Sequence, residues 1–396
     1  MSAEPESLAP DHVRGTGSIR IGIVAGEASG DALGAGLMAA LKGRYPGCRF
    51  AGIGGPRMLE QGLESLVPMD RLGMNGIIDP IKRLPELLGI LRGLVAAFTA
   101  DPPEVFVGVD FNVFNLLLEG MLKRRGMTTV HYVSPSVYAW RRGRVRRISR
   151  SADMLLTLYP FEPAFYEREP VQAVFVGHPL ADEIQPAASG DDSAALARQA
   201  MGIAADARCV ALLPGSRLSE VRMLADLFLD AATIISRTLP DSVFVIPCLR
   251  PAIANWIGAR LTDYPQLTVV TYEGDARRAL TACEGALIKS GTCTLEAMLL
   301  GRPMVVSYKL GELTYQLVHR MLRTPFIALP NILAGEELVP ELLQHDATPA
   351  ALAEKLLEQL DKAQREPEYL ARFADLHRQL RKGADARAAD AVAGWF

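Results

Sequence analysis

The chain lacks the long hydrophobic run that a membrane-spanning helix needs. No apolar run reaches the roughly 18 residues required to cross a bilayer, and the longest candidate, residues 84–100, contains a proline, a glutamate and an arginine. Residues 1–18 lack the order of a signal peptide, a charged region followed by an apolar one. They are rich in Pro, Ser, Glu and Gly, and we expect a flexible tail. The sequence therefore predicts a protein that does not span a membrane.

Cysteine and histidine are scarce, and their spacing has no metal-site pattern. None of the five cysteines forms a CxxC pair, and the six histidines show no metal-ligand spacing. Most of the cysteines lie in or beside apolar runs, so we expect reduced core thiols in a cytoplasmic protein. No metal ion and no other cofactor is predicted.

Net charge is also small, at −3, so the molecule as a whole is not predicted to bind polyanions. Between Lys123 and Arg150, however, there are nine basic residues and no acidic one. Two interpretations stay open for this basic run: a solvated surface, or a seat for anionic lipid headgroups or a phosphorylated substrate. Nucleic acid is not a predicted partner, because no nucleic-acid-binding motif accompanies the run.

Apolar strand-like runs alternate with helix-like runs along the whole chain. This alternation predicts an α/β protein whose parallel sheets are covered on both faces. The predicted strands are residues 19–25, 49–53, 105–109, 129–133, 154–158 and 173–176 in the first half, and 209–213, 243–247, 268–271, 286–288 and 304–307 in the second. Each half opens with a strand, a Gly/Ser loop and a helix, so we predict two Rossmann-like domains.

The domain limits follow from composition. The N-terminal domain is expected over 19–186 and the second over 205–349, with a polar connection rich in Pro, Gly, Asp and Ser between them. Residues 350–396 are charged and helical, and we expect them to pack back on the N-terminal domain or on a partner subunit. The oligomeric state, a homodimer included, is left open.

Two loops of the second half have the form of phosphate sites. Ser290, Gly291 and Thr292 follow an apolar strand and precede a helix. Gly215 and Ser216 lie in a second loop of this kind. Backbone N–H groups and the positive end of a helix dipole converge at such turns. The pair predicts a nucleotide diphosphate ligand.

Charged residues accompany both loops. Arg217, the only cation of its loop, would offset the charge that develops on a departing diphosphate; the alternative is a surface salt bridge. Glu296, one turn into the helix after Thr292, could hold a sugar hydroxyl.

The first half offers a carboxylate at a strand end. Asp110 follows an apolar strand, at the edge where open α/β sheets bind ligands, and is a candidate general base; the alternative is a helix cap. The turn containing Gly26, Ser29 and Asp31 lacks the GxGxxG pattern. It is interpreted either as tight β-to-α packing or as acceptor binding.

Polar residues follow two further strands of the first half. Ser134 and Ser136 lie among aromatic residues, which line either a cleft or the core. His178 lies near the predicted domain junction, where a structural hydrogen bond is the strong alternative to a substrate contact.

Taken in order, seven segments resemble the lipid-A-disaccharide synthase family. They are Gly26–Asp31, Gly52–Pro56, Val133–Ser136, Phe175–Pro179, Leu213–Arg217, Ser290–Ala297 and Leu329–Gly335. The resemblance runs from about Ile21 to Gln344. Any one segment is a weak signal, whereas the ordered set is highly specific.

The resemblance implies an inverting, metal-independent glycosyltransferase of the GT-B architecture. Such enzymes transfer from UDP-2,3-diacylglucosamine to 2,3-diacylglucosamine 1-phosphate, form a β(1→6) bond and release UDP. The N-terminal domain would bind the acceptor and the second domain the UDP-sugar. Asp110, Arg217, Glu296 and Asn331 match positions that are functional in the family.

Two departures from the family pattern matter. The family usually reads Asp-Ala-Pro-Asp-Phe-Asn where this chain reads Asp-Phe-Asn-Val-Phe-Asn from Asp110, so the second acid is replaced by Val113. Asp110 is thereby the only local candidate for a base. Tyr138 also stands where the family favours tryptophan.

Acylated substrates imply contact with a membrane. Residues 69–98 carry many apolar side chains with basic neighbours, which is typical of a segment that lies in the bilayer interface; the alternative is that they cover the first sheet. With the basic run, this segment predicts peripheral binding to an anionic membrane, at the cytoplasmic face of the inner membrane of a Gram-negative bacterium. Two other functions remain: a UDP-sugar epimerase of the same fold, and a nucleotide-sugar sensor without turnover.

Overall fold

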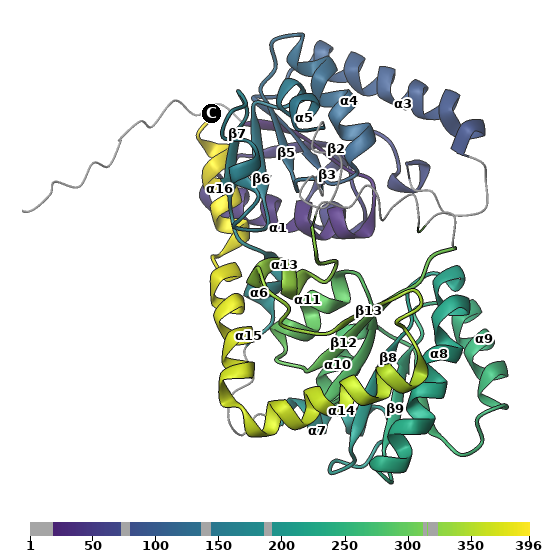
Figure 1. Ribbon diagram of the computed structural model, residues 1–396. Helices are drawn as coiled ribbons and strands as arrows, with labels where there is room; N and C mark the ends of the chain where they lie inside the picture. Colours follow the sequence, from purple (N-terminus) through teal and green to yellow (C-terminus); the bar gives the residue numbers. More distant parts are fainter. Residues whose placement is uncertain (1–18, 73–79, 136–143, 186–191, 312–314, 316–323) are drawn as a thin grey trace, which may run out of the picture. The chain divides into compact units, whose positions relative to one another are not determined.

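The computed structural model describes residues 19–72, 80–135, 144–185, 192–311, 315 and 324–396 (Figure 1). It contains two sheets, in which all the pairings described are parallel. None of its described helices is both long enough and apolar enough to cross a membrane.

The first sheet has seven strands in the order β3-β2-β1-β4-β5-β6-β7. Their bounds are β1 Arg20–Ala25, β2 Arg49–Ile53, β3 Leu63–Ser65, β4 Val105–Val109, β5 Thr129–Tyr132, β6 Met154–Thr157 and β7 Gln172–Phe175. The central strand β4 is buried along its whole length, as expected for a parallel sheet covered on both faces.

The second sheet has six strands in the order β10-β9-β8-β11-β12-β13. Their bounds are β8 Cys209–Leu213, β9 Val243–Pro247, β10 Thr268–Tyr272, β11 Gly285–Lys289, β12 Met304–Tyr308 and β13 Glu341–Leu343. Successive residues of β8 enter two different hydrophobic clusters: Cys209 and Ala211 belong to one, Val210 and Leu212 to the other. This alternation places a core on each face of the sheet.

The helices lie between the strands, as the alternating pattern predicts (Figure 1). Their bounds are α1 Ala28–Arg44, α2 Pro56–Glu60, α3 Pro80–Ala100, α4 Asn112–Lys123, α5 Val145–Ser151, α6 Pro179–Glu183, α7 Ser193–Ala200, α8 Leu218–Thr238, α9 Pro251–Leu261, α10 Ala276–Ala282, α11 Thr292–Leu299, α13 Leu329–Ala334, α14 Pro349–Arg365, α15 Pro367–Leu380 and α16 Ala384–Ala393.

The predicted α/β class and strand pattern are confirmed. Every predicted strand is present, with its ends displaced by no more than one residue. The sequence missed β3 and β13, which are short strands at the sheet edges. Neither carries the continuous apolar run that marks a buried parallel strand.

The chain divides into two compact units. Unit 1 comprises the described residues up to Val133, with residues 150–155 and 388–396; unit 2 comprises those among 134–149 and 156–387. Within unit 1 the C-terminal residues contact α1 and the residue after it. Arg44 pairs with Asp390 at 2.8 Å, and the rings of Tyr45 and Phe396 meet edge to face.

Candidate active site

Asp110 lies in unit 1, directly after β4, on a strained stretch of backbone. Asp110 and Phe111 both have positive φ, +49° and +45°, a region that costs non-glycine residues free energy. Backbone hydrogen bonds hold the turn: Asp110 N–H donates to the carbonyl of Tyr132 at 2.8 Å, and its carbonyl accepts from Asn115 Nδ2 at 2.8 Å. The turn fixes the position at which the carboxylate emerges.

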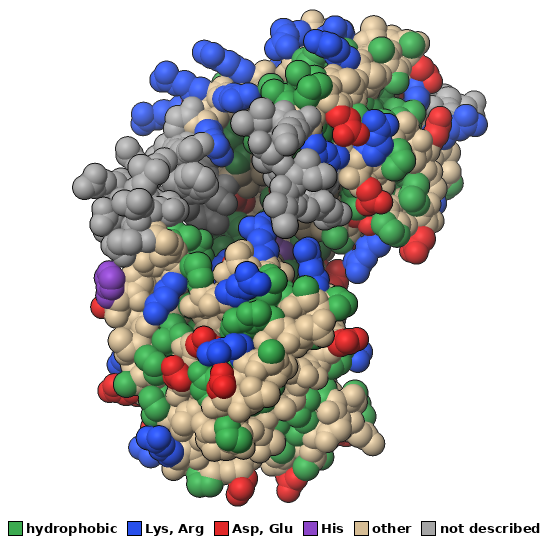
Figure 2. All heavy atoms as spheres, turned by 90° about the vertical axis from the view of Figure 1, so that its right-hand side faces the viewer, with side chains coloured by type: hydrophobic (Ala, Val, Ile, Leu, Met, Phe, Trp, Pro, Cys, Tyr) green, Lys and Arg blue, Asp and Glu red, His purple; other side chains and the backbone are tan. Residues whose placement is uncertain are grey.

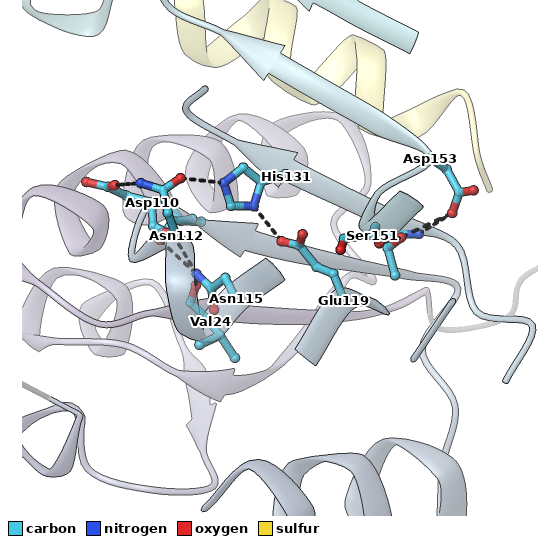
Figure 3. Close-up of polar contacts among 10 residues, drawn as sticks. Val24, Asp110, Asn112, Asn115, Glu119, His131, Ser151 and Asp153 are labelled. Carbon is cyan, nitrogen blue, oxygen red and sulfur yellow. Dashed lines mark hydrogen bonds and ion pairs between the residues drawn. The ribbon is translucent and has the colours of Figure 1, made fainter. Parts of the chain in front are cut away.

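The Asp110 side chain does not cap the following helix. The N-cap of α4 is Phe111, and no side chain accepts a hydrogen bond there. Instead Asp110 Oδ1 accepts from Asn112 Nδ2 at 3.2 Å (Figure 3). Its Oδ2 accepts from Ser29 Oγ at 3.4 Å. Among the described residues no cation pairs with this half-buried carboxylate, which is therefore available to accept a proton.

The glycine-rich turn after β1 packs closely against Phe111 and carries two polar side chains, Ser29 and Asp31. A Cβ at Gly26 would lie 2.5 Å from the ring of Phe111, so glycine is needed for close packing there. Asp31 is buried and accepts from the backbone N–H groups of Gly55, Arg57 and Met58 at 2.8–3.0 Å. It thereby satisfies the open N-terminus of α2, whereas the exposed Ser29 reaches Asp110.

In unit 2, the loop after β8 is organised around Glu220. Its Oε2 accepts from the backbone N–H groups of Ser216 and Arg217 at 3.2 and 3.4 Å. Gly215 has φ +140°, and a Cβ there would lie 2.7 Å from the same oxygen. Arg217 precedes α8 with its side chain 79% exposed. The loop thus donates to an anion, and the Arg217 guanidinium forms an exposed ion pair with Glu220 Oε1 at 4.0 Å.

Sequence reasoning missed Glu220 and Lys289. Lys289 ends β11, and its Nζ lies 3.2 Å from Glu220 Oε1 and 5.1 Å from the ring centroid of Tyr308. The available signal was a lysine at the end of an apolar strand, immediately before Ser290. Lys289 is therefore a second cation, besides Arg217, at the Glu220 carboxylate.

The loop after β11 has the predicted strand–turn–helix form. The N–H of Ser290 donates to Ser307 O at 3.0 Å and its hydroxyl to Ile327 O at 3.2 Å. Gly291 and Thr292 are exposed, and α11 begins at Thr292. The first turn of a helix has N–H groups without intrahelical acceptors, so this surface suits an anion.

Glu296 lies within α11 and is partly buried. In the part of the chain that the structure describes, its carboxylate has no hydrogen-bond or ion-pair partner. Burial raises its pKa, and the charge of Arg277 opposes that rise. An unpaired acceptor beside the Ser290 loop can receive a hydroxyl donor.

Ser134 and His178 both form hydrogen bonds within unit 2. Ser134 is buried, and its Oγ lies 3.0 Å from the hydroxyl of Tyr166. His178 is also buried, and its Nδ1 accepts from Leu180 N–H at 3.2 Å at the start of α6. Burial lowers the pKa of His178 to about 4, so the ring is neutral at neutral pH. Their substrate contacts stay predictions, and Ser136 lies outside the described residues.

Asn331 holds a turn of the chain. It is fully buried; its amide nitrogen donates to Val339 O and Glu341 Oε1, and its oxygen accepts from the N–H groups of Leu338 and Val339, all within 2.9 Å. All its hydrogen-bonding capacity is used within the protein. A role in binding would be exerted through the backbone that it fixes.

The fold is similar to that of a solved glycosyltransferase and of a solved UDP-GlcNAc 2-epimerase. One neighbour is the glycotransferase of kitacinnamycin (TM-score 0.61, 17% identity, 95% of this chain and 98% of that chain). Another is the UDP-GlcNAc 2-epimerase from Neisseria meningitidis bound to UDP-GlcNAc (TM-score 0.61, 12% identity, 95% and 99%). Two parallel-sheet α/β units of this kind have the GT-B architecture. The protein's family match makes it a glycosyltransferase.

The sequence defines the family within that class. The family model for lipid-A-disaccharide synthetase matches residues 21–392. The lipid-A-disaccharide synthase of Cellvibrio japonicus is 48% identical over 378 residues, which cover 96% of this chain and 97% of that protein. The chain belongs to the lipid-A-disaccharide synthase family.

Proposed function

We propose that the protein transfers diacylglucosamine from UDP-2,3-diacylglucosamine to the 6-hydroxyl of 2,3-diacylglucosamine 1-phosphate. Asp110 takes the hydroxyl proton as the oxygen attacks C1 of the donor sugar. The bond from C1 to the diphosphate breaks, and UDP leaves with the electron pair. Attack opposite the leaving group inverts the anomeric centre and gives the β(1→6) disaccharide 1-phosphate.

The carboxylate of Asp110 is the observation that carries this proposal. It follows a central strand, is partly exposed, and has no cation partner among the described residues. A base in glycosyl transfer needs such an open acceptor within reach of a hydroxyl. The two substrates are proposed from family membership.

The donor diphosphate is assigned to unit 2. Arg217, Lys289 and the turn at Ser290–Thr292 would stabilise the charge of departing UDP without a metal ion. The backbone N–H groups of Ser216 and Arg217 already donate to a carboxylate, which supports an anion at this loop. The bound diphosphate would then replace Glu220 as the acceptor of these two N–H groups.

Replacing Glu296 with glutamine is expected to lower UDP affinity about tenfold, because a hydrogen bond to a charged group contributes about 1.5–3 kcal/mol and one to a neutral amide oxygen only about 0.5–1.5 kcal/mol. The two side chains have nearly equal volume, so the fold should be unaffected. Calorimetry with UDP and with pyrophosphate separates the contacts, since pyrophosphate has no ribose. The exposed Glu354→Gln on α14 is the control. Equal losses for UDP and pyrophosphate would remove Glu296 from the sugar contact.

We also propose that α3 lies against an anionic bilayer. The C-terminal half of the helix belongs to the core: Ile90, Leu91 and Leu94 are buried. Nearer the N-terminus, Leu84 and Leu88 are 52% and 39% exposed and one turn apart. Ile77 and Ile78 lie outside the described residues. Figure 2 shows Lys and Arg side chains beside hydrophobic ones in its upper part, the region of α3 and α4.

Serine at both Leu84 and Leu88 is expected to weaken binding to anionic vesicles by at least about tenfold, since a fully buried leucine contributes about 1.5–3 kcal/mol. UDP affinity should not change. Vesicle flotation measures the effect, and Leu196→Ser, at a leucine on α7 that is 62% exposed, is the control. Added salt should also weaken binding of the unsubstituted protein. Flotation unaffected by both the serines and salt would contradict this placement at the membrane of a Gram-negative cell.

The activity is tested by UDP release with a panel of acylated acceptors. The proposal predicts continuous release that requires both acylated sugars and continues in the presence of a chelator. An epimerase would release no UDP in steady turnover, and a sensor would release none with any acceptor. Either of those results, from protein that binds UDP, would overturn the proposal.

A further inference from the structure

A row of hydrogen-bonded polar side chains in unit 1 runs from Glu119 through His131 and Asn112 to Asp110. His131 on β5 and Glu119 on α4 are both fully buried, and His131 Nδ1 lies 2.7 Å from Glu119 Oε1 (Figure 3). Gly108 on β4 is the register partner of His131. A Cβ on Gly108 would lie 2.1 Å from Glu119 Oε1, so the missing side chain makes room for the carboxyl group. Three elements thus place this pair.

The row continues from His131 to Asp110 through Asn112. His131 Nε2 lies 3.0 Å from Asn112 Oδ1, and Asn112 Nδ2 donates to Asp110 Oδ1 at 3.2 Å. The Asp110 carboxylate can only accept, so Asn112 turns its NH₂ toward Asp110 and its oxygen toward His131. His131 Nε2 must therefore carry a hydrogen and donate it to Asn112.

The other end of the row holds one shared proton. Glu119 Oε2 is buried and has no hydrogen-bond partner in the described part of the chain. An ionised carboxylate would leave that oxygen without a donor, and burial raises the pKa of Glu119. Whether the shared proton is bound to Glu119 Oε1 or to His131 Nδ1, the hydrogen bond between them leaves Nε2–H directed at Asn112. Glu119 thus fixes the orientation of the His131 ring.

We infer that Glu119, His131 and Asn112 are positioning residues that orient the Asp110 carboxylate for transfer. This inference rests on the proposed role of Asp110 as the base. The row occupies Oδ1 of Asp110 and leaves a lone pair of Oδ2 for the acceptor hydroxyl. An amide cannot pass a proton along, so the row orients the base without relaying charge.

The last link differs from the family pattern quoted in the sequence analysis. Asn112 stands where the family pattern has proline, whose ring can make neither hydrogen bond. The neighbouring family acid is absent as well, since Val113 replaces it. Here Asp110 is therefore held from the side of β5, by a contact that a proline would not provide.

Two substitutions of Asn112 test the inference. Alanine removes both hydrogen bonds and is expected to lower kcat about tenfold or more, because a base displaced by about 1 Å can lose up to 10²-fold. The KM for the donor should not change. Aspartate has almost the volume of asparagine but cannot donate to Asp110 and repels it, so kcat should fall further than with alanine. Val113→Ala, the next residue on α4 and 72% exposed, is the control.

A matched pair at Glu119 tests the buried end. The amide N–H of Glu119→Gln can still donate to His131 Nδ1. Because this hydrogen bond is retained, kcat is expected to stay within about threefold of that of the unsubstituted protein. Glu119→Met fills similar space but removes the donor, and kcat should fall as it does for Asn112→Ala. A merely structural role predicts the opposite order at Asn112, with the isosteric aspartate milder than alanine.

The outcomes separate this inference from the proposed function. Unchanged kcat in folded Asn112→Ala and Asn112→Asp proteins, alongside an inactive Asp110→Asn, would overturn the positioning row alone. An active Asp110→Asn would overturn the base on which the row depends. The inference is supported if both Asn112 variants have a lowered kcat and an unchanged donor KM, and if kcat is lower for Asn112→Asp than for Asn112→Ala.

Discussion

Replacing Asp110 with asparagine is expected to lower kcat by about 10²–10⁴, the usual contribution of a general base. Asparagine has nearly the same volume, and the strained turn depends on backbone groups that it retains. Fold and UDP affinity should therefore survive. The change removes only the ability to accept the hydroxyl proton.

Single-turnover kinetics with saturating donor and acceptor measures this effect. Calorimetric UDP affinity and the melting temperature show whether the variant is intact. Asp206→Asn, an exposed aspartate before β8, is the matched control. A folded Asp110→Asn protein with unchanged kcat would show that Asp110 is not the base.

Replacing Arg217 with alanine is expected to weaken UDP binding by about tenfold to a hundredfold, since a hydrogen bond to a charged group contributes about 1.5–3 kcal/mol. Transfer should slow as well, because the charge on departing UDP grows in the transition state. Stability should hardly change. The side chain is 79% exposed, and its guanidinium is 4.0 Å from Glu220.

Titration calorimetry with UDP and steady-state kinetics measure the two consequences. Arg222→Ala provides the control, because Arg222 is also exposed and lies on α8, the helix that Arg217 precedes. Equal UDP affinity in the two variants, with normal kinetics in both, would contradict the assignment of the diphosphate to this loop.

Local sequence pattern predicted the fold because burial in a parallel sheet is a local property. Each long strand is an apolar run bounded by turn residues, and every predicted strand is present. The edge strands β3 and β13 were missed because each has only three residues of mixed polarity. The other two edge strands, β7 and β10, are longer and contain apolar runs, and they were predicted.

The candidate site was predicted less completely, because side-chain partners depend on tertiary structure. Asp110 could be found from its place after a strand. The pairing of Glu220 with Lys289 could not, since the two residues are 69 positions apart and meet only because β8 and β11 are neighbours. The positioning row was hidden for the same reason. Its one sequence signal was Gly108, a glycine within an otherwise bulky strand.

The structure of the product tests the proposed inverting transfer between two diacylated glucosamines most directly. Mass spectrometry and proton NMR can be applied to the lipid formed from UDP-2,3-diacylglucosamine and 2,3-diacylglucosamine 1-phosphate. We expect one new disaccharide 1-phosphate, formed in equal amount to UDP, with a β linkage to the 6-hydroxyl. An α linkage, or UDP release without a disaccharide, would contradict it.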